Sequence, residues 1–156
     1  MESLPLLLVD CTMGKLARWL RLAGIDSALD QRPPDALRLR QISDLDHRTI
    51  LTRSKDVFQK NGPDRSVLIG FNAPMEQARQ VMRHFKIQRH ALKPLSRCAE
   101  CNVVLSVQPK DAVLGLVPDY VWQQHELFLR CSRCRRIYWP GTHAHRTRYL
   151  IDQWFL

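Results

Sequence analysis

The chain has 156 residues, of which 45% are hydrophobic and 25% are charged, and this composition is typical of globular proteins and excludes an extensively disordered chain. Its net charge of +9 favours polyanionic partners, nucleic acid above all, although charge alone also suits a protein without a specific ligand in a ribosome-rich or membrane-surface environment. The first apolar run, residues 4–9, is too short to span a bilayer and lacks the features of a signal peptide, so we expect a cytoplasmic protein with no membrane partner.

The first ninety residues alternate short apolar runs with helical patterns. The run at residues 6–9 is typical of a strand buried on both faces, and Asp10 follows it directly. A helix with apolar residues at helical spacing comes next and should end at Gly24. The later elements are expected as strands at residues 25–29, 49–52 and 67–71 and as helices at residues 35–45 and 74–85. Strands that alternate with helices predict an α/β fold with a parallel sheet.

Composition changes after residue 93, where short apolar segments and two Cys-x-x-Cys turns suggest a small antiparallel module. The pairs are Cys98 with Cys101 and Cys131 with Cys134. One such turn presents two thiolates to a metal ion, and a second turn completes the tetrahedral set that zinc prefers. A redox dithiol or two disulfides would be the alternatives, but the duplication favours zinc in a zinc ribbon. Four thiolates leave no open coordination position, so the zinc is expected to be structural.

Several oxygen-bearing side chains are expected at one edge of the parallel sheet. Asp10 follows the first strand, Ser54 and Asp56 follow the strand at residues 49–52, and Asp35 stands where a helix begins. Ligands bind at the carboxyl ends of such strands, and carboxylates gathered there favour Mg²⁺ or Mn²⁺. Taken singly, each aspartate could instead cap a helix or lie in a solvated turn. Together these residues suit metal-assisted hydrolysis of a phosphodiester, because the ion polarises the phosphate and activates a water.

Four segments resemble, in order along the chain, the Mut-seven C-terminal RNase family. They are LVDCTMGKLARWLRLAG at residues 8–24, Ile-Leu-Thr-Arg at 50–53, Arg-Cys-x-x-Cys-Asn at 97–102 and Cys-x-x-Cys-x-x-Ile-Tyr-Trp-x-Gly-Thr-His at 131–143. The resemblance implies a PIN-like α/β/α nuclease domain over residues 1–93 and a zinc ribbon module over residues 94–156. It further implies a metal-dependent ribonuclease whose acidic centre includes Asp10 and Asp35.

The chain departs from the family at one position of that centre. Family members usually carry an aspartate directly after Leu-Thr-Arg, whereas this chain has Ser54 there and Asp56 two residues later. Either Asp56 replaces the missing carboxylate, or the ion is held less tightly with Ser54 as a neutral ligand. The alternative to an enzyme is therefore a catalytically weakened RNA-binding or ribosome-associated module. A toxin-like nuclease inhibited by a protein partner is a third hypothesis, and the sequence identifies no such partner.

Basic and aromatic residues are the candidates for RNA binding. Lys15 and Arg18 lie on the helix that begins beside Asp10, and Arg21 on the same helix could serve likewise or face solvent. Arg53 adjoins the acidic centre and could bind a phosphate in a bidentate way. Arginines and aromatic side chains are interleaved around the second cysteine pair, where stacking on unpaired bases is expected. The residues of this group are Arg133, Arg135, Tyr138, Trp139 and His143. We thus predict hydrolysis of single-stranded RNA or RNA ends.

Overall fold

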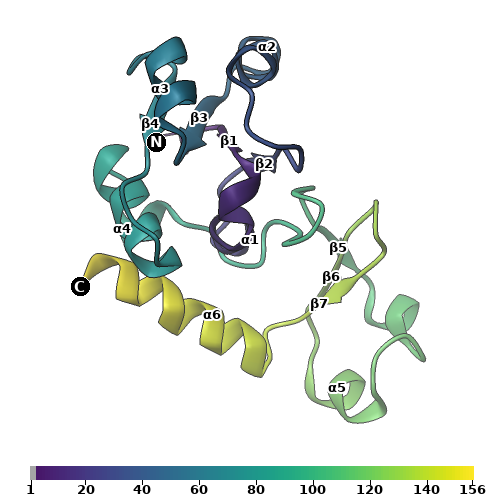
Figure 1. Ribbon diagram of the computed structural model, residues 1–156. Coiled ribbons are helices and arrows are strands. Elements are labelled where there is room, and N and C mark those ends of the chain that lie inside the picture. Colours follow the sequence, from purple (N-terminus) through teal and green to yellow (C-terminus); the bar gives the residue numbers. More distant parts are fainter. Residues whose placement is uncertain (1–2) are drawn as a thin grey trace.

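A parallel sheet of four strands forms the centre of the N-terminal part of the protein, in a computed structural model that describes residues 3–156 (Figure 1). The strands are β1 (Leu7–Val9), β2 (Ser27–Leu29), β3 (Thr49–Thr52) and β4 (Ser66–Leu68), in the order β2-β1-β3-β4. All three neighbouring pairs run parallel. The predicted α/β class with a parallel sheet is confirmed. Strand β2 begins later than expected because the amide of Ile25 still donates to Leu20 O at the end of the preceding helix.

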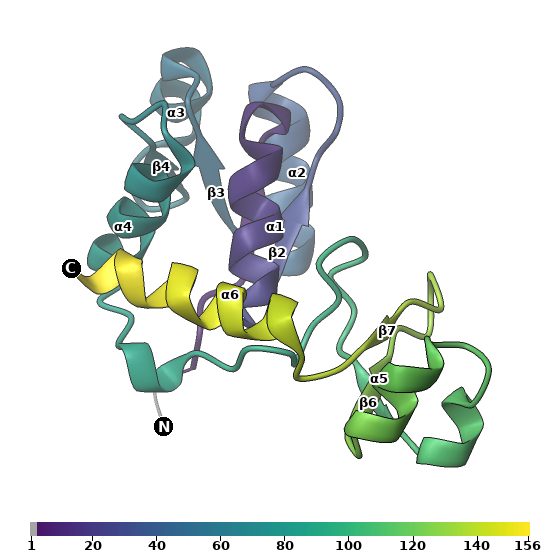
Figure 2. The ribbon, with the colours of Figure 1, turned by 90° about the horizontal axis from the view of Figure 1, so that it is seen from below.

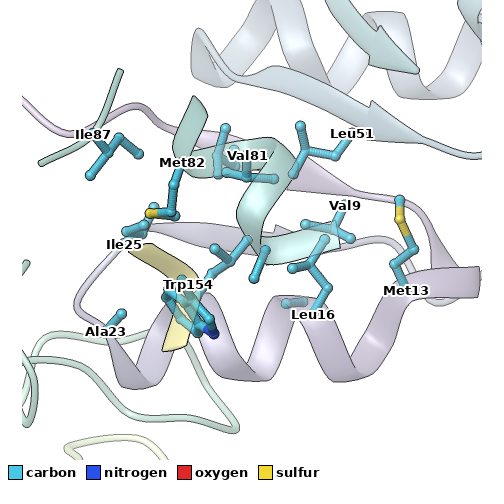
Figure 3. Packing of buried hydrophobic residues seen from close by; sticks show 14 of the residues in the cluster. Val9, Met13, Leu16, Ala23, Ile25, Leu51, Val81, Met82, Ile87 and Trp154 are labelled. Carbon is cyan, nitrogen blue, oxygen red and sulfur yellow. The ribbon is translucent and has the colours of Figure 1, made fainter. Parts of the chain in front are cut away.

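Helices cover both faces of this sheet, because successive side chains of a strand point to opposite sides. Leu7 and Val9 join a core with α1 (Gly14–Leu22) and α4 (Pro74–His84), whereas Leu8 packs against α2 (Ala36–Asp46) and α3 (Lys55–Asn61). Figure 3 shows the first of these cores, with Val9 and Leu51 of the sheet between side chains of the helices. The continuous apolar run at the start of the chain therefore serves two cores at once.

Three short antiparallel strands form the second sheet, as the sequence predicted for the module after residue 93. They are β5 (Ser106–Gln108), β6 (Phe128–Arg130) and β7 (Ile137–Tyr138), in that order, and α5 (Asp119–Gln124) lies in the connection between β5 and β6. The apolar run at residues 103–105 contributes only an isolated bridge between Arg97 and Val104. The two small hydrophobic cores of this module surround the cysteines and Phe128.

The last helix, α6 (Thr142–Asp152), returns from the second sheet to the first part of the molecule (Figure 2). Ile151 and Trp154 are buried in the core formed by α1 and α4, and the Trp154 ring stacks on Trp19 with centroids 6.5 Å apart. The Arg79 guanidinium of α4 donates to Gln153 O at 2.9 and 3.1 Å. The core of the parallel sheet thus takes side chains from both sides of residue 93, and the division at 1–93 and 94–156 remains a prediction about folding units.

Candidate functional site

A row of residues crosses the sheet at the carboxyl ends of its strands. Asp30 follows β2 and its amide donates to Val9 O at 3.1 Å, while Asp10 follows β1 and its amide donates to Leu51 O at 3.1 Å. These bonds continue the strand register, which places Asp30, Asp10 and Thr52 side by side at the carboxyl edge. Such an edge is where open α/β sheets bind ligands.

The Asp10 carboxylate is the most buried acidic group of this row, and the residue is 1% exposed. Its Oδ1 accepts from the amide of Thr12 at 2.9 Å and from the Thr12 hydroxyl. Its Oδ2 accepts from the Thr52 hydroxyl at 2.7 Å and from the amide of Arg53 at 3.1 Å. Four donors occupy the lone-pair positions of the carboxylate. A cation could therefore bind Asp10 only by replacing one of these donors.

Asp30 is a site residue that the sequence reasoning missed. Burial would raise the pKa of its carboxyl group, but hydrogen bonds from Arg38 at 2.8 Å and Arg32 at 3.1 Å outweigh burial and lower the pKa. The residue is 8% exposed and lies beside Asp10. The signal that could have found it is the one that selected Asp10, because Asp30 also comes directly after a strand.

The other predicted oxygen ligands make local contacts. Asp35 caps α2, accepting from the amide of Arg38 at 2.7 Å, and Asp56 pairs with Lys60 at 2.9 Å one turn along α3. Ser54 caps α3, and its amide donates to the Thr52 hydroxyl that holds Asp10. Within residues 3–156 the carboxylates do not form a group of three or more with ligand atoms as close as those of the cysteines. Metal binding by Asp10, Asp35 and Asp56 stays a prediction.

The four cysteines do converge. The sulfur atoms of Cys98, Cys101, Cys131 and Cys134 all lie within 4.8 Å of one another, and the Cys98 and Cys134 sulfurs are 3.7 Å apart. A tetrahedral ion with Zn–S bonds of about 2.3 Å requires sulfur atoms about 3.8 Å apart. The geometry and the soft donor set both fit the ion, so the four cysteines could hold a metal such as zinc. The amides of Cys101 and Cys134 donate to the first sulfur of each pair, at 3.4 and 3.5 Å.

Neighbouring groups set the protonation of these sulfurs. Burial would raise the pKa of the Cys98 thiol, but hydrogen bonds from Tyr138, from the Cys101 amide and from the other thiols lower it. Burial and hydrogen bonds to Cys134 and Cys131, with the charge of Cys98, raise the pKa of Cys101 to about 12. Four sulfurs this close cannot all ionise without a cation between them, and metal binding must therefore release protons.

The first cysteine pair is fastened to the parallel sheet. The buried Arg21 of α1 donates to Ser27 O at 2.8 Å and to the carbonyls of Ala99 and Glu100 at 3.1 and 2.9 Å. Burial lowers the pKa of this guanidinium, and the sulfurs of the nearby cysteines oppose the shift. Arg21 therefore joins two parts of the molecule and does not lie on a solvated face.

A second contact between the cysteine module and the sheet centres on Asp26. Its Oδ1 accepts from Arg48 at 2.6 Å and from the side-chain amide of Asn102 at 2.7 Å, while Asn102 accepts from the amide of Ser27 at 2.9 Å. Burial would raise the pKa of Asp26, but these hydrogen bonds and the two arginines near it lower it. The residue after the first Cys-x-x-Cys turn is thus fixed against the start of β2.

The predicted RNA-binding residues fall into two groups. Near the acidic row, Lys15 lies over the Trp19 ring with its Nζ 5.3 Å from the centroid, and the Arg53 side chain donates to Asn72. At the cysteine module, Arg133 and Arg135 are exposed on the second turn. Arg18, Tyr138, Trp139 and His143 line a common cavity between α1, β7 and α6. The Tyr138 hydroxyl also contacts Cys98 at 3.2 Å, and burial together with this contact raises the pKa of Tyr138 to about 12.

A doubly covered parallel sheet joined to an antiparallel module with four convergent cysteines defines the class, an α/β protein with a cysteine cluster that could hold a metal ion. Residues 5–151 match the model of the Mut7-C RNAse domain, and the chain belongs to this family. Membership indicates a ribonuclease-like function and RNA as the substrate. Comparisons with curated proteins and with solved structures gave no match. In the described part of the chain, no helix has the length and apolar character needed to cross a membrane.

Proposed function

We propose that this protein is a metal-dependent ribonuclease that hydrolyses phosphodiester bonds of single-stranded RNA or of RNA ends. The observation that carries the proposal is the position of the buried Asp10, held beside Asp30 at the carboxyl edge of the sheet, in a chain of the Mut7-C RNAse family. The thiolate centre lies on another module and has no open position, which assigns hydrolysis to the acidic edge.

A hard cation suits this edge because Mg²⁺ is commonly bound by one or two carboxylates, with water and substrate phosphate completing the shell. Asp10 and Asp30 would supply such a pair once the cation displaces one donor from Asp10 and an arginine from Asp30. Asp35, Asp56 and the neutral oxygen of Ser54 are the further candidates. Bound Mg²⁺ or Mn²⁺ would polarise the phosphate and activate a water nucleophile. Thr12 and Thr52 orient Asp10 through their hydroxyl groups.

Positive side chains beside this edge would neutralise charge on the phosphate. Arg53 follows β3 directly, and its amide already contacts Asp10. Lys15 lies in the first turn of α1, which begins beside Asp10. Preorganised cations next to a transferring phosphate stabilise the charge that develops there. We assign Arg53 and Lys15 this role.

We propose zinc as the ion of the four cysteines, with a purely structural role. Thiolate ligands persist in a reducing compartment, which supports a cytoplasmic location. The zinc keeps the basic and aromatic residues near Cys131 and Cys134 in one arrangement, since the small hairpins bury few apolar side chains of their own.

The second candidate function is RNA binding with little cleavage, and Ser54 favours it. Its hydroxyl accepts from the amide of Val57 at 3.3 Å, so it caps α3 where a carboxylate would supply charge to the edge. The Ser54→Asp variant separates the two functions, because aspartate is an equally good helix cap. If Ser54 only weakens the metal site, the variant should gain metal affinity and cleavage rate. No change in either quantity would contradict the hypothesis that Ser54 weakens the site.

The enzyme proposal is tested with labelled single-stranded RNA and Mn²⁺, comparing the natural protein with Asp10→Asn. Cleavage by the natural protein and its loss in the variant is the expected result. Asp111→Asn removes the same charge at an exposed site and should cleave normally. Circular dichroism must confirm that Asp10→Asn is folded, because its NH₂ group would face a backbone donor, the amide of either Thr12 or Arg53. Cleavage by both Asp10 forms, or by neither, rejects the proposal.

A further inference from the structure

A second candidate ligand site, apart from the acidic edge, is the cavity where α1, the cysteine module and α6 meet. Its volume is about 420 Å³, within the range of about 300–1,000 Å³ typical of small-ligand sites. Leu22 of α1, Leu95 and Leu150 of α6 contribute apolar walls. Figure 2 shows α6 leading from the second sheet across α1, which brings these distant segments together. The cavity thus depends on the complete chain.

The rim of the cavity is positively charged. Arg18 of α1, Arg136 just before β7 and Arg146 of α6 line it, and no Asp or Glu in residues 3–156 does so. Glu100 stands outside the lining and pairs with both Arg18 and Arg136, whose side chains are still 50% and 53% exposed. Arg146 makes no ion pair with any described residue. Three guanidinium groups against one carboxylate leave an excess of positive charge that attracts an anion.

The indole ring of Trp139 lies at the same cavity, close to the backbone of Gly141. Trp139 is partly exposed, and a Cβ atom added at Gly141 would stand 2.7 Å from its Nε1. That contact is closer than side chains tolerate, so glycine at position 141 allows the indole its present place. The cavity therefore combines an aromatic ring, apolar walls and exposed arginines, which are the chemical features that recognise a base and its phosphate.

We propose that this cavity binds one nucleotide of the single-stranded RNA, with its base against Trp139 and its phosphate at Arg18 and Arg146. The proposal rests on RNA as the substrate, but it does not require cleavage. The residues of the acidic edge, Asp10, Asp30, Thr52 and Arg53, do not line this cavity, so the cavity is distinct from the acidic edge. A strand held there would be anchored by one nucleotide while another part of it reaches Asp10.

Two matched pairs of variants test this anchoring site. Arg146→Gln removes a rim charge, and Arg148→Gln removes the same charge from the same helix outside the cavity. Trp139→Leu removes the ring, and Tyr149→Leu removes an aromatic side chain from α6 that is 69% exposed and outside the cavity. Gly141→Ala is a further test variant, which displaces the indole without deleting it.

The measurement is the fluorescence anisotropy of a labelled oligouridylate, titrated with each protein without added divalent ions. Arg146→Gln, Trp139→Leu and Gly141→Ala should each weaken binding by about tenfold, while the two controls change it by less than about twofold. Unlabelled AMP should compete only weakly, because a strand gains from further phosphate contacts.

Several outcomes would overturn the anchoring site. Equal weakening by Arg146→Gln and Arg148→Gln would mean that only general surface charge attracts the strand. Competition by AMP as strong as by the unlabelled strand would assign the cavity to free mononucleotides, and absence of RNA binding would reject the site outright. Selective weakening together with absence of Mn²⁺-dependent cleavage would sustain the site and reject the ribonuclease proposal, so the two can fail separately.

Discussion

Trp154→Ala should remove a large part of the stability of the parallel-sheet core, although residue 154 is almost the last of the chain. The Trp154 side chain is 3% exposed and packs with Ile151 among side chains of α1 and α4, against the Trp19 ring. Truncating a buried tryptophan to alanine costs about 3–5 kcal/mol, through lost burial and the cavity left behind. A domain of this size has a total stability of about 5–15 kcal/mol. The variant should therefore lose about a fifth or more of its free energy of unfolding.

Urea unfolding followed by far-ultraviolet circular dichroism, at a fixed zinc concentration, measures this loss. Leu156→Ala is the matched control, because Leu156 is 83% exposed and its truncation should change stability by no more than about 0.5 kcal/mol. A loss below about 1 kcal/mol for Trp154→Ala would refute the reasoning. Such a result would mean that residues 1–93 fold without the C-terminal segment.

Three further perturbations have defined outcomes. A chelator that removes the ion should increase amide hydrogen exchange at residues 97–138 and leave α2 and α3 protected, because the small hairpins have little core of their own; unchanged exchange throughout would count against a structural metal. Asp26→Asn should cost about 1.5–3 kcal/mol by removing the nearer of the two carboxylates that pair with Arg48. Because folding lowers the pKa of Asp26, its contribution is present above the unfolded pKa of about 3.9 and is lost as pH falls through the folded value. The natural protein should thus lose more stability than the variant between about pH 5 and about pH 2. A parallel loss of stability in the two proteins would contradict the assignment. Gly24→Ala should cost at least about 2 kcal/mol, since φ is +89° and the new Cβ would stand 2.5 Å from Lys93 O, while Gly70→Ala meets no atom within 4 Å and serves as the control in the same urea assay.

The cysteine module and the edge of the sheet are linked more closely than their separation in sequence suggests. Arg21 binds the carbonyls of Ala99 and Glu100, and Asp26 holds Asn102, so the first Cys-x-x-Cys turn rests on α1 and the start of β2. An ion bound by the cysteines would therefore fix the orientation of the cysteine module relative to the acidic edge of the sheet. This connection offers a physical reason for a structural metal in a protein whose proposed chemistry occurs elsewhere.

Sequence patterns predicted the strands of the parallel sheet and the helices α1, α2 and α4, because burial on both faces produces continuous apolar runs and helices repeat every 3.6 residues. The helices α3, α5 and α6 were not predicted. Leu7 to Val9 and Thr49 to Thr52 are strands as expected, and the two Cys-x-x-Cys pairs converge as their duplication indicated. The cysteine geometry was predictable because each turn places two sulfurs together locally, and only one long-range contact remained to be formed.

The acidic edge was less predictable, since position in sequence does not reveal which way a side chain turns. Asp35 begins a predicted helix and Asp56 follows the strand at residues 49–52, and in the structure Asp35 caps α2 while Asp56 pairs with Lys60. Asp30 escaped notice because no motif marks it, although the strand register places it next to Asp10. In the sequence, Arg21 does not differ from the other basic residues of its helix. Its burial results from the contact between α1 and the cysteine module.

Periodicity and short-range spacing in the sequence were enough to indicate the parallel sheet and the four cysteines that could hold an ion. The folded structure was needed to show that Trp154 completes the first core and that Arg18, Trp139 and Arg146 share one cavity. Both results depend on the path of α6 back across α1. That path is set by the summed burial of side chains far apart in the chain, a quantity that no local pattern records.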